Sequence, residues 1–159
     1  MPLDTQDAHH LLAAVGYLEL EMFADADAEL DLIDADVRHL PEILSVRVHI
    51  YSGAKKWELM LAVAKRLAEY DPSNVEWTVN YAYALRRAVS LESATAVLMS
   101  AVERDAVPGI YHFNLACYHC QTGKLAEAQT FLAAAFKREK RFRQLALEDS
   151  DLEPLWKSL

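Results

Sequence analysis

Two cysteines, Cys117 and Cys120, have the spacing that comes nearest to a chemical motif. A C-x-x-C pair can carry out thiol–disulfide exchange or supply half of a zinc site. Redox pairs normally lie at a helix N-terminus, where the dipole lowers the thiol pKa, whereas this pair is expected in mid-helix. His112 and His119 are the nearby candidate ligands, but His119 lies about 100° around the helix from Cys120. We therefore expect buried thiols that act as small apolar residues, and a metal or redox protein is the least favoured alternative.

Other chemical motifs are weak in this sequence. The adjacent pair His9–His10 is more typical of an exposed polar surface than of a metal site. The glycines are isolated, and none precedes a Lys-Ser or Lys-Thr pair, so no phosphate-binding loop is expected. The carboxylates are numerous, but no pocket is implied for a hydrolase dyad. We expect no enzyme, no metal and no cofactor.

The composition suits a single helical domain. The 159 residues are 53% apolar, which is enough for a continuous core, and 4 Gly and 5 Pro favour helices over a sandwich or barrel. No apolar run approaches the roughly 20 residues that a membrane-spanning helix needs. Asp4 and Asp7 stand where an export signal would be basic and then apolar. Because two cysteines make no disulfide framework, we expect a cytoplasmic protein without membrane contact.

The net charge of −8 is spread unevenly along the chain. Residues 1–42 hold 11 acidic residues and a single basic one, Arg38, whereas 43–159 hold 13 acidic and 15 basic residues. An acidic protein of this kind is not expected to bind nucleic acid, which requires a basic face. We interpret the acidic residues of the first segment mainly as a solvated outer face. A basic cluster at 137–143 is explained by the affinity of cations for a helix C-terminus.

The segment 109–136 contains a pattern that the rest of the chain repeats. It reads as a helix, a turn at Gly123 and a second helix, and shifting the sequence by 34 residues reproduces it upstream. Four units, 7–40, 41–74, 75–108 and 109–142, cover nearly the whole chain. The equivalent apolar positions are Ala14, Val48, Ala82 and Ala116; Ala26, Met60, Ala94 and Ala128; Ile33, Leu67, Ala101 and Ala135.

Turn signals predict where individual helices begin and end. Pro41 and Ser90 suit helix starts, and Gly53 suits a left-handed stop. The run 71–74 is a stop followed by a new start, and we expect a helix over 24–37. The tail 143–159 is expected to form a capping helix that begins at Ser150 or Asp151 and covers the open end of the core. Its apolar side would contain Leu152, Leu155, Trp156 and Leu159, with Trp156 as the main cover.

With this period, helix–turn–helix unit and pattern of small residues, the chain resembles the tetratricopeptide repeat (TPR) family. Tyr17 and Tyr51 match the family's tyrosine, and Pro72 matches its unit-ending proline. The family's first tryptophan is replaced by His10, Leu44, Thr78 and His112. The resemblance implies an all-α fold, an α-solenoid of antiparallel helix pairs forming a TPR-like superhelix, with a single domain over 1–159.

The resemblance also implies a binding groove, lined by the first helix of each unit. Carried over onto this sequence, its candidate residues are Ser45, His49, Ser52, Tyr83, Arg86, Arg87, Phe113, Cys117, Cys120 and Gln121. A helical or extended peptide that carries an acid and one or two apolar anchors would suit them. Leu11 and Val15 stand where the family members that bind acidic chaperone tails have Lys and Asn, so that particular activity is not expected.

The expected function is therefore that of an adaptor, scaffold or chaperone-like module that binds another protein. The alternative is a homo-oligomeric structural protein, in which the acidic residues 1–42 of one copy attract the basic cluster 137–143 of the next. Such a head-to-tail contact would build rings or filaments.

Overall fold

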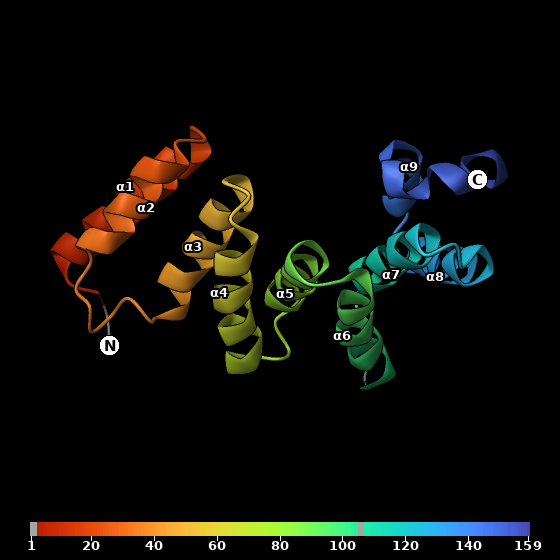
Figure 1. The fold of residues 1–159 in the computed structure, drawn as a ribbon, viewed down its shortest axis with the longest axis horizontal. Coiled ribbons are helices and arrows are strands. Elements are labelled where there is room, and N and C mark those ends of the chain that lie inside the picture. Colours follow the sequence, from red (N-terminus) through yellow and green to blue (C-terminus); the bar gives the residue numbers. More distant parts are fainter. Residues whose placement is uncertain (1–2, 105–106) are drawn as a thin grey trace. The chain divides into compact units, whose positions relative to one another are not determined.

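The computed structural model describes residues 3–104 and 107–159, and all regular structure in these residues is helical (Figure 1). The expected all-α class is thus confirmed.

The chain separates into two compact units, Met1–Val89 and Ser90–Leu159, called unit 1 and unit 2. One continuous domain over 1–159 stays a prediction. Unit 1 contains α1 (Thr5–Glu19), α2 (Phe23–Leu32), α3 (Pro41–Gly53), α4 (Trp57–Tyr70) and α5 (Val75–Ala88). Unit 2 contains α6 (Leu91–Arg104), α7 (Gly109–Gln121), α8 (Leu125–Arg138), α9 (Phe142–Glu148) and the 3₁₀-helix η1 (Ser150–Ser158).

Consecutive helices pack in pairs within each unit. Helix α1 packs on α2, α3 on α4, and α7 on α8, and in unit 1 α5 packs on α4 and touches α3 (Figure 1). Each of the twelve apolar positions predicted from the 34-residue period is buried, with at most 7% of its surface exposed. Eight of the twelve are alanines, and such small side chains let paired helices approach closely, because no bulk keeps the backbones apart.

The tight turns between paired helices share one backbone feature. Glu21, Lys55 and Gly123 occupy equivalent positions of the 34-residue sequence repeat, and their φ angles are 57°, 57° and 76°. Each therefore takes the left-handed conformation that lets one helix end and the next begin. Val89 is the equivalent residue between α5 and α6, and its φ of −124° lies outside that region. The division between the two units falls at this residue.

Gly53 does not act as the left-handed stop that the sequence suggested, and that prediction is wrong. It is the last residue of α3, and Lys55 provides the left-handed turn instead. A side chain at Gly53 would collide with the ring of Phe23, at the start of α2. Glycine is thus present because an aromatic ring from the preceding helix pair packs directly on the backbone.

The predicted helix starts are confirmed. Pro41 is in the first turn of α3, and the side chain of Asn74 accepts a 3.1 Å hydrogen bond from the backbone of Trp77 at the start of α5. Ser90 Oγ accepts a 3.1 Å bond from the backbone N–H of Ser93, as an N-cap does.

Helix α2 is shorter than the predicted 24–37, because it ends at Leu32. The Nε of Arg38 donates to the carbonyl of Ile33 at 2.6 Å, and its Nη2 donates to the carbonyl of Asp31 at 2.7 Å. One guanidinium therefore satisfies carbonyls at the end of α2 that a longer helix would have paired internally.

The tail contains α9 followed by η1, which begins at Ser150 as predicted and is capped by Asp149. Leu152 and Leu155 are buried, at 0% and 3% exposed, and they are the residues that cover the core. Trp156 is 37% exposed, so the prediction that it is the main cover is wrong. Its indole Nε1 donates to the carbonyl of Ala146 at 2.9 Å, which holds the ring against α9 rather than in the core.

Candidate functional site

Six of the ten predicted groove residues lie together in unit 1, on the neighbouring helices α3 and α5. We call this surface the α3–α5 face. It contains Ser45, His49 and Ser52 from α3, and Tyr83, Arg86 and Arg87 from α5.

Polar contacts join the two helices of this face at one end. The indole Nε1 of Trp77 donates to Ser45 Oγ at 3.0 Å, and His49 Nε2 lies 2.9 Å from Glu76 Oε1. His49 and Glu76 are both largely exposed, with 47% and 63% of their side chains accessible. An exposed pair of this kind adds little to stability, so both groups stay available to a partner.

An aromatic and cationic cluster forms the other end of the face. Arg87 lies over the indole of Trp57, with its guanidinium carbon 4.7 Å from the ring centroid. Tyr83 meets Trp57 edge-on, with ring centroids 5.9 Å apart at 84°. Tyr83 is 36% exposed, and Arg87 is exposed. We call Trp57, Tyr83 and Arg87 the Trp57 cluster; it offers apolar surface and positive charge to the same ligand.

Sequence reasoning missed Trp57 and Trp77, which hold the predicted residues in place. Trp57 begins α4, and it bears the same relation to Arg87 as Phe23, at the start of α2, bears to Gly53. In both cases the first residue of a second helix packs on a position 30 residues later. The two pairs are related by the 34-residue period, so an alignment of the sequence repeats against one another could have found the contact.

The other four predicted residues lie on α7 in unit 2, where the chain's own tail contacts this helix; three of them are buried and Gln121 is exposed. Phe113, Cys117 and Cys120 are 5%, 3% and 4% exposed. The ring of Phe113 stacks on Phe142 of α9, with centroids 5.0 Å apart. This burial means that these three side chains are not accessible to a partner while the tail is in place.

Polar contacts fix the tail to the same face of α7. The thiol of Cys117 donates to Asp149 Oδ2 at 3.7 Å, and Gln121 Nε2 donates to the carbonyl of Asp151 at 2.9 Å. The tail therefore lies along α7 instead of merely closing the end of the repeat stack.

His112 and His119 lie on a different side of α7 from the thiols, against Phe131 of α8. The ring of His119 stacks on Phe131 with centroids 5.2 Å apart and planes at 1°, and His112 is tilted at 6.3 Å. His112 Nδ1 and His119 Nε2 are buried, and no hydrogen-bond partner for either atom is found among the described residues. Burial lowers the pKa of both histidines, and the charges of Arg138 near His112 and of Lys124 near His119 act in the same direction. The expected burial of the two cysteines is confirmed, and burial raises the pKa of the Cys120 thiol.

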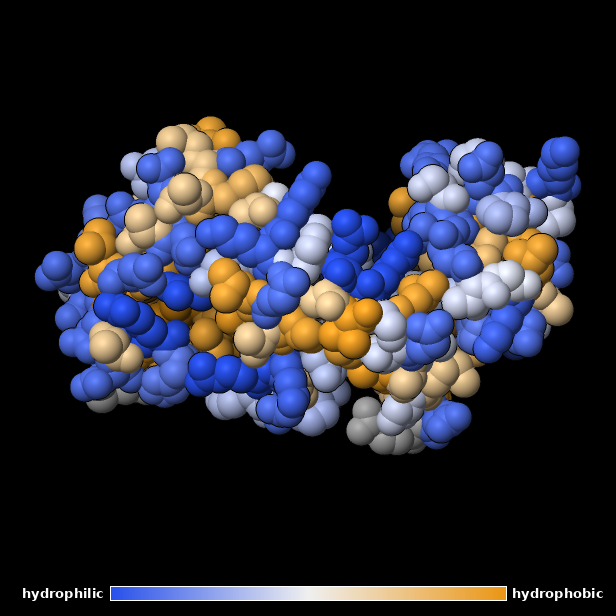
Figure 2. Space-filling model, in the orientation of Figure 1, coloured by the Kyte–Doolittle hydropathy of each residue, from blue (hydrophilic) through white to orange (hydrophobic). Residues whose placement is uncertain are grey.

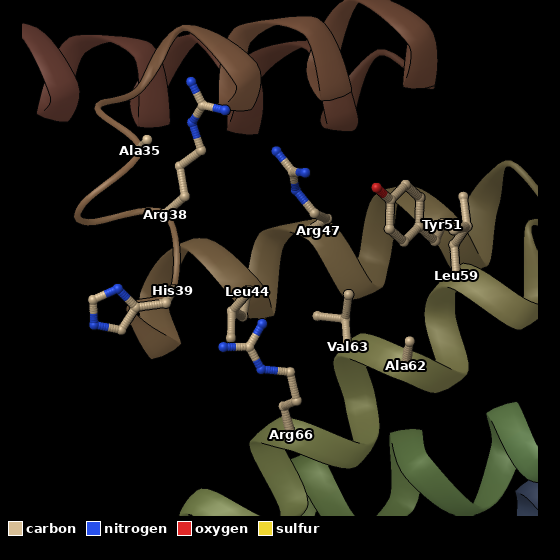
Figure 3. A pocket seen from close by; sticks show the side chains of 10 residues that line it. All are labelled: Ala35, Arg38, His39, Leu44, Arg47, Tyr51, Leu59, Ala62, Val63 and Arg66. Atoms are coloured by element: carbon tan, nitrogen blue, oxygen red, sulfur yellow. The ribbon is translucent and has the colours of Figure 1, made fainter.

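A hollow of about 360 Å³ lies among α3, α4 and the loop that leaves α2 (Figure 3). It was not predicted from the sequence. Arg38 and Arg47 line it, but their guanidinium groups point toward α2. Arg47 Nη2 lies 2.8 Å from Asp31 Oδ1 and its Nε lies 3.8 Å from Asp27 Oδ1. Burial opposes the charged form of Arg47, but these partners raise its pKa overall. These two cations are committed within the fold, whereas Arg66 and His39, which also line the hollow, are exposed.

Most acidic residues of the N-terminal segment are exposed, as interpreted from the sequence, but several of them also contact other groups within the fold. Asp7 accepts the backbone N–H of Asp34 at 2.9 Å, and Glu29 Oε2 lies 2.8 Å from His10 Nδ1. Asp27 and Asp31 pair with Arg47, whereas Asp25 and Asp36 are exposed. On the side of the molecule shown in Figure 2, hydrophilic residues are interspersed with smaller apolar areas.

The basic cluster 137–143 is partly engaged as its helix-end position predicted. Arg138 Nη1 donates to the carbonyl of Ala134 at 3.1 Å, near the end of α8. Arg141 pairs with Glu139 at 2.7 Å, and Arg143 lies over the ring of Phe136 at 5.0 Å. Lys137 and Lys140 are exposed.

The described helices form an all-α fold that resembles TPR-like helical repeats. Among solved structures, the chain is similar to one described as "MamA MSR-1 C2", a TPR-like protein, with a TM-score of 0.56 and 16% sequence identity. The similarity covers 87% of this chain and 99% of that chain. No family model matches the sequence, and no curated protein matches it. In the described part of the chain, no helix is both long and apolar enough to span a bilayer.

Proposed function

We propose that this protein is a non-catalytic interaction module, and that its α3–α5 face binds a segment of another protein. The observation that carries the proposal is the Trp57 cluster. It places an exposed guanidinium, an indole and a partly exposed tyrosine side by side on two packed helices. Tryptophan, tyrosine and arginine dominate the energetics of protein interfaces, because each combines a large contact area with a polar group.

The chemistry of the face defines the partner segment. Arg87 would pair with a carboxylate of the partner, and an apolar side chain would pack on Trp57 and Tyr83. His49 and Glu76 would contact the polar part of the same segment from the far end of the face. Reversible capture at about micromolar affinity corresponds to roughly 8 kcal/mol, which a few such contacts can supply. The two cysteines form no disulfide in the described structure, which fits a protein that works in a reducing compartment such as the cytoplasm.

The test compares proteins captured from the native cell by the wild type and by two charge-reversed variants. Arg87→Glu removes the cation of the Trp57 cluster, and Arg66→Glu reverses another exposed arginine, on α4. The partner should be lost with Arg87→Glu and kept with Arg66→Glu. Titration of the identified partner should then show at least about a tenfold loss of affinity for Arg87→Glu. Equal binding by both variants would overturn the proposal.

The alternative, head-to-tail self-assembly, depends on charges that remain exposed at the two ends of the chain. Asp25 and Asp36 would supply the acidic side, and Lys137 and Lys140 the basic side. Its support is narrower than for partner binding, because Arg47 already neutralises Asp27 and Asp31, and Arg138, Arg141 and Arg143 contact groups within unit 2.

A further inference from the structure

The contact between α7 and the tail brings together a set of metal-binding groups that the sequence alone did not connect. Ligand atoms of Cys117, Asp149 and Asp151 all lie within 4.8 Å of one another. Cys117 comes from the middle of α7, whereas the two carboxylates flank the start of η1, more than 30 residues later. The thiol is buried and the carboxylates are half-buried, so the cluster has an apolar side and a side that solvent reaches.

The geometry fits a small tetrahedral ion. Zinc binds thiolate sulfur at about 2.3 Å and carboxylate oxygen at about 2.0–2.2 Å, so a sulfur and an oxygen on one tetrahedral ion lie roughly 3.5 Å apart. The observed separation of Cys117 Sγ and Asp149 Oδ2 is 3.7 Å. A divalent ion would therefore require little rearrangement of this pair.

Capping of η1 explains the position of only one of the two oxygens of the Asp149 carboxylate. Its Oδ1 accepts the backbone N–H of Asp151 at 2.9 Å, which caps η1, while its Oδ2 faces the thiol. Two carboxylates and a thiolate at this distance would repel one another when all are ionised, and a divalent cation removes that repulsion.

Cys120 lies one turn beyond Cys117 on the same helix and is close enough to feel the second carboxylate. Burial raises the pKa of its thiol, and the charge of Asp151 adds to the effect. Its sulfur is not one of the ligand atoms that lie within 4.8 Å of one another, so Cys120 is not part of the proposed site.

We propose that Cys117, Asp149 and Asp151 bind one divalent ion of the zinc class, and that the ion fastens the tail to α7. On binding, the Cys117 thiol releases its proton to solvent and its sulfur forms the bond to the metal, while the two carboxylates bind in their ionised form. Because one proton is released on binding, the affinity for the metal should increase with pH. The histidines, which are nearby in the sequence and were not favoured as ligands there, face Phe131 and take no part.

The test is a titration of the reduced full-length protein with Cd²⁺, followed by competition with Zn²⁺. Sulfur-to-cadmium charge transfer gives an ultraviolet absorption that reports thiolate ligation directly. The absorption should saturate at one ion per chain and be lost in Cys117→Ala. Asp149→Asn and Asp151→Asn should each weaken Zn²⁺ binding by more than about tenfold. Asparagine caps a helix as well as aspartate does, so Asp149→Asn removes the anionic ligand while keeping the cap.

Asp25→Asn is the matched control, because Asp25 is an exposed carboxylate on α2 of unit 1. It should leave both the absorption and the Zn²⁺ affinity unchanged. A second readout is thermal: Zn²⁺ should raise the melting temperature of the wild type and not that of Cys117→Ala. Absence of a charge-transfer absorption, an absorption that persists in Cys117→Ala, or equal Zn²⁺ affinity in Asp149→Asn and wild type would each overturn the proposal.

Discussion

The ring of Phe23 occupies the space that a β-carbon on Gly53 would need. Phe23 begins α2 and Gly53 ends α3, so this contact joins the first helix pair of unit 1 to the second. Trp57 and Arg87 make the equivalent contact one repeat later, where a guanidinium rather than a missing side chain meets the ring. Gly53 and Arg87 thus occupy the same position of the repeat. Gly53 makes a packing contact between helix pairs, whereas Arg87 contributes to the candidate binding surface.

Gly53→Ala is expected to destabilise the protein by about 1–3 kcal/mol, because the new methyl group displaces the Phe23 ring. In a Phe23→Ala background the same change should be neutral or stabilising, since alanine is the better helix residue and the ring is gone. Urea unfolding of the four proteins gives the double-mutant cycle. Additive effects of the two substitutions would show that Gly53 is not required by this contact.

The buried histidines of α7 predict a loss of stability in acid. The pKa of His112 and His119 is lowered from 6.5 in the folded protein, so the unfolded chain binds protons more readily below that value. Their contribution to stability is complete above about pH 6.5 and decreases as the pH falls toward the lowered folded pKa. The free energy of unfolding should therefore be smaller at about pH 5.5 than at about pH 7.5.

Replacing both histidines by phenylalanine should flatten this pH dependence, because the variant has no imidazole to protonate at these sites. His39→Gln is the control, since His39 is exposed, and it should leave the slope unchanged. Urea unfolding across the pH range measures all three proteins. A double variant that keeps the wild-type slope would assign the acid sensitivity to other groups.

The repeat period predicted the helix pairs and their buried positions, because those features depend on local spacing within 34 residues. Ala14, Ala82 and Ala116 were found in this way, and each is fully buried. The end of α2 was predicted five residues too late, because Arg38 binds its terminal carbonyls by a contact that periodicity does not encode.

The candidate site was predicted only in part, because the position of the tail decides which of the predicted residues on α7 are accessible. Nothing in the spacing of Asp149, Leu152 and Leu155 shows that η1 lies along α7 beside Cys117, or that Phe142 of α9 stacks on Phe113. A 3₁₀-helix lacks the period of 3.6 residues by which faces are recognised, so its partner surface had to come from the structure.

Releasing the tail should expose the thiols of α7. Leu152 is fully buried, so Leu152→Asp places a charge in the core at a cost of about 3 kcal/mol or more. This cost favours the detached tail. Cys117 and Cys120 should then react with a thiol reagent much faster than in the wild type, at unchanged pH. Leu159→Asp is the matched control, because Leu159 is 46% exposed and its substitution should not alter the rate. Slow reaction in Leu152→Asp would show that the tail does not control access to this face.

The sizing of the purified protein distinguishes the interaction module from a self-assembling one. Head-to-tail association would depend on exposed acids near Asp25 and Asp36 meeting Lys137 and Lys140, so it would strengthen as salt is removed. We expect light scattering to report a monomer at low and at high salt, because the arginines of the basic cluster already have contacts in unit 2 and leave few charges for such an interface. A mass that grows with concentration at low salt, and falls in Lys137→Glu/Lys140→Glu, would favour assembly instead. The Arg87→Glu variant should have the wild-type mass in either case, since Arg87 lies on α5 and outside both charged segments.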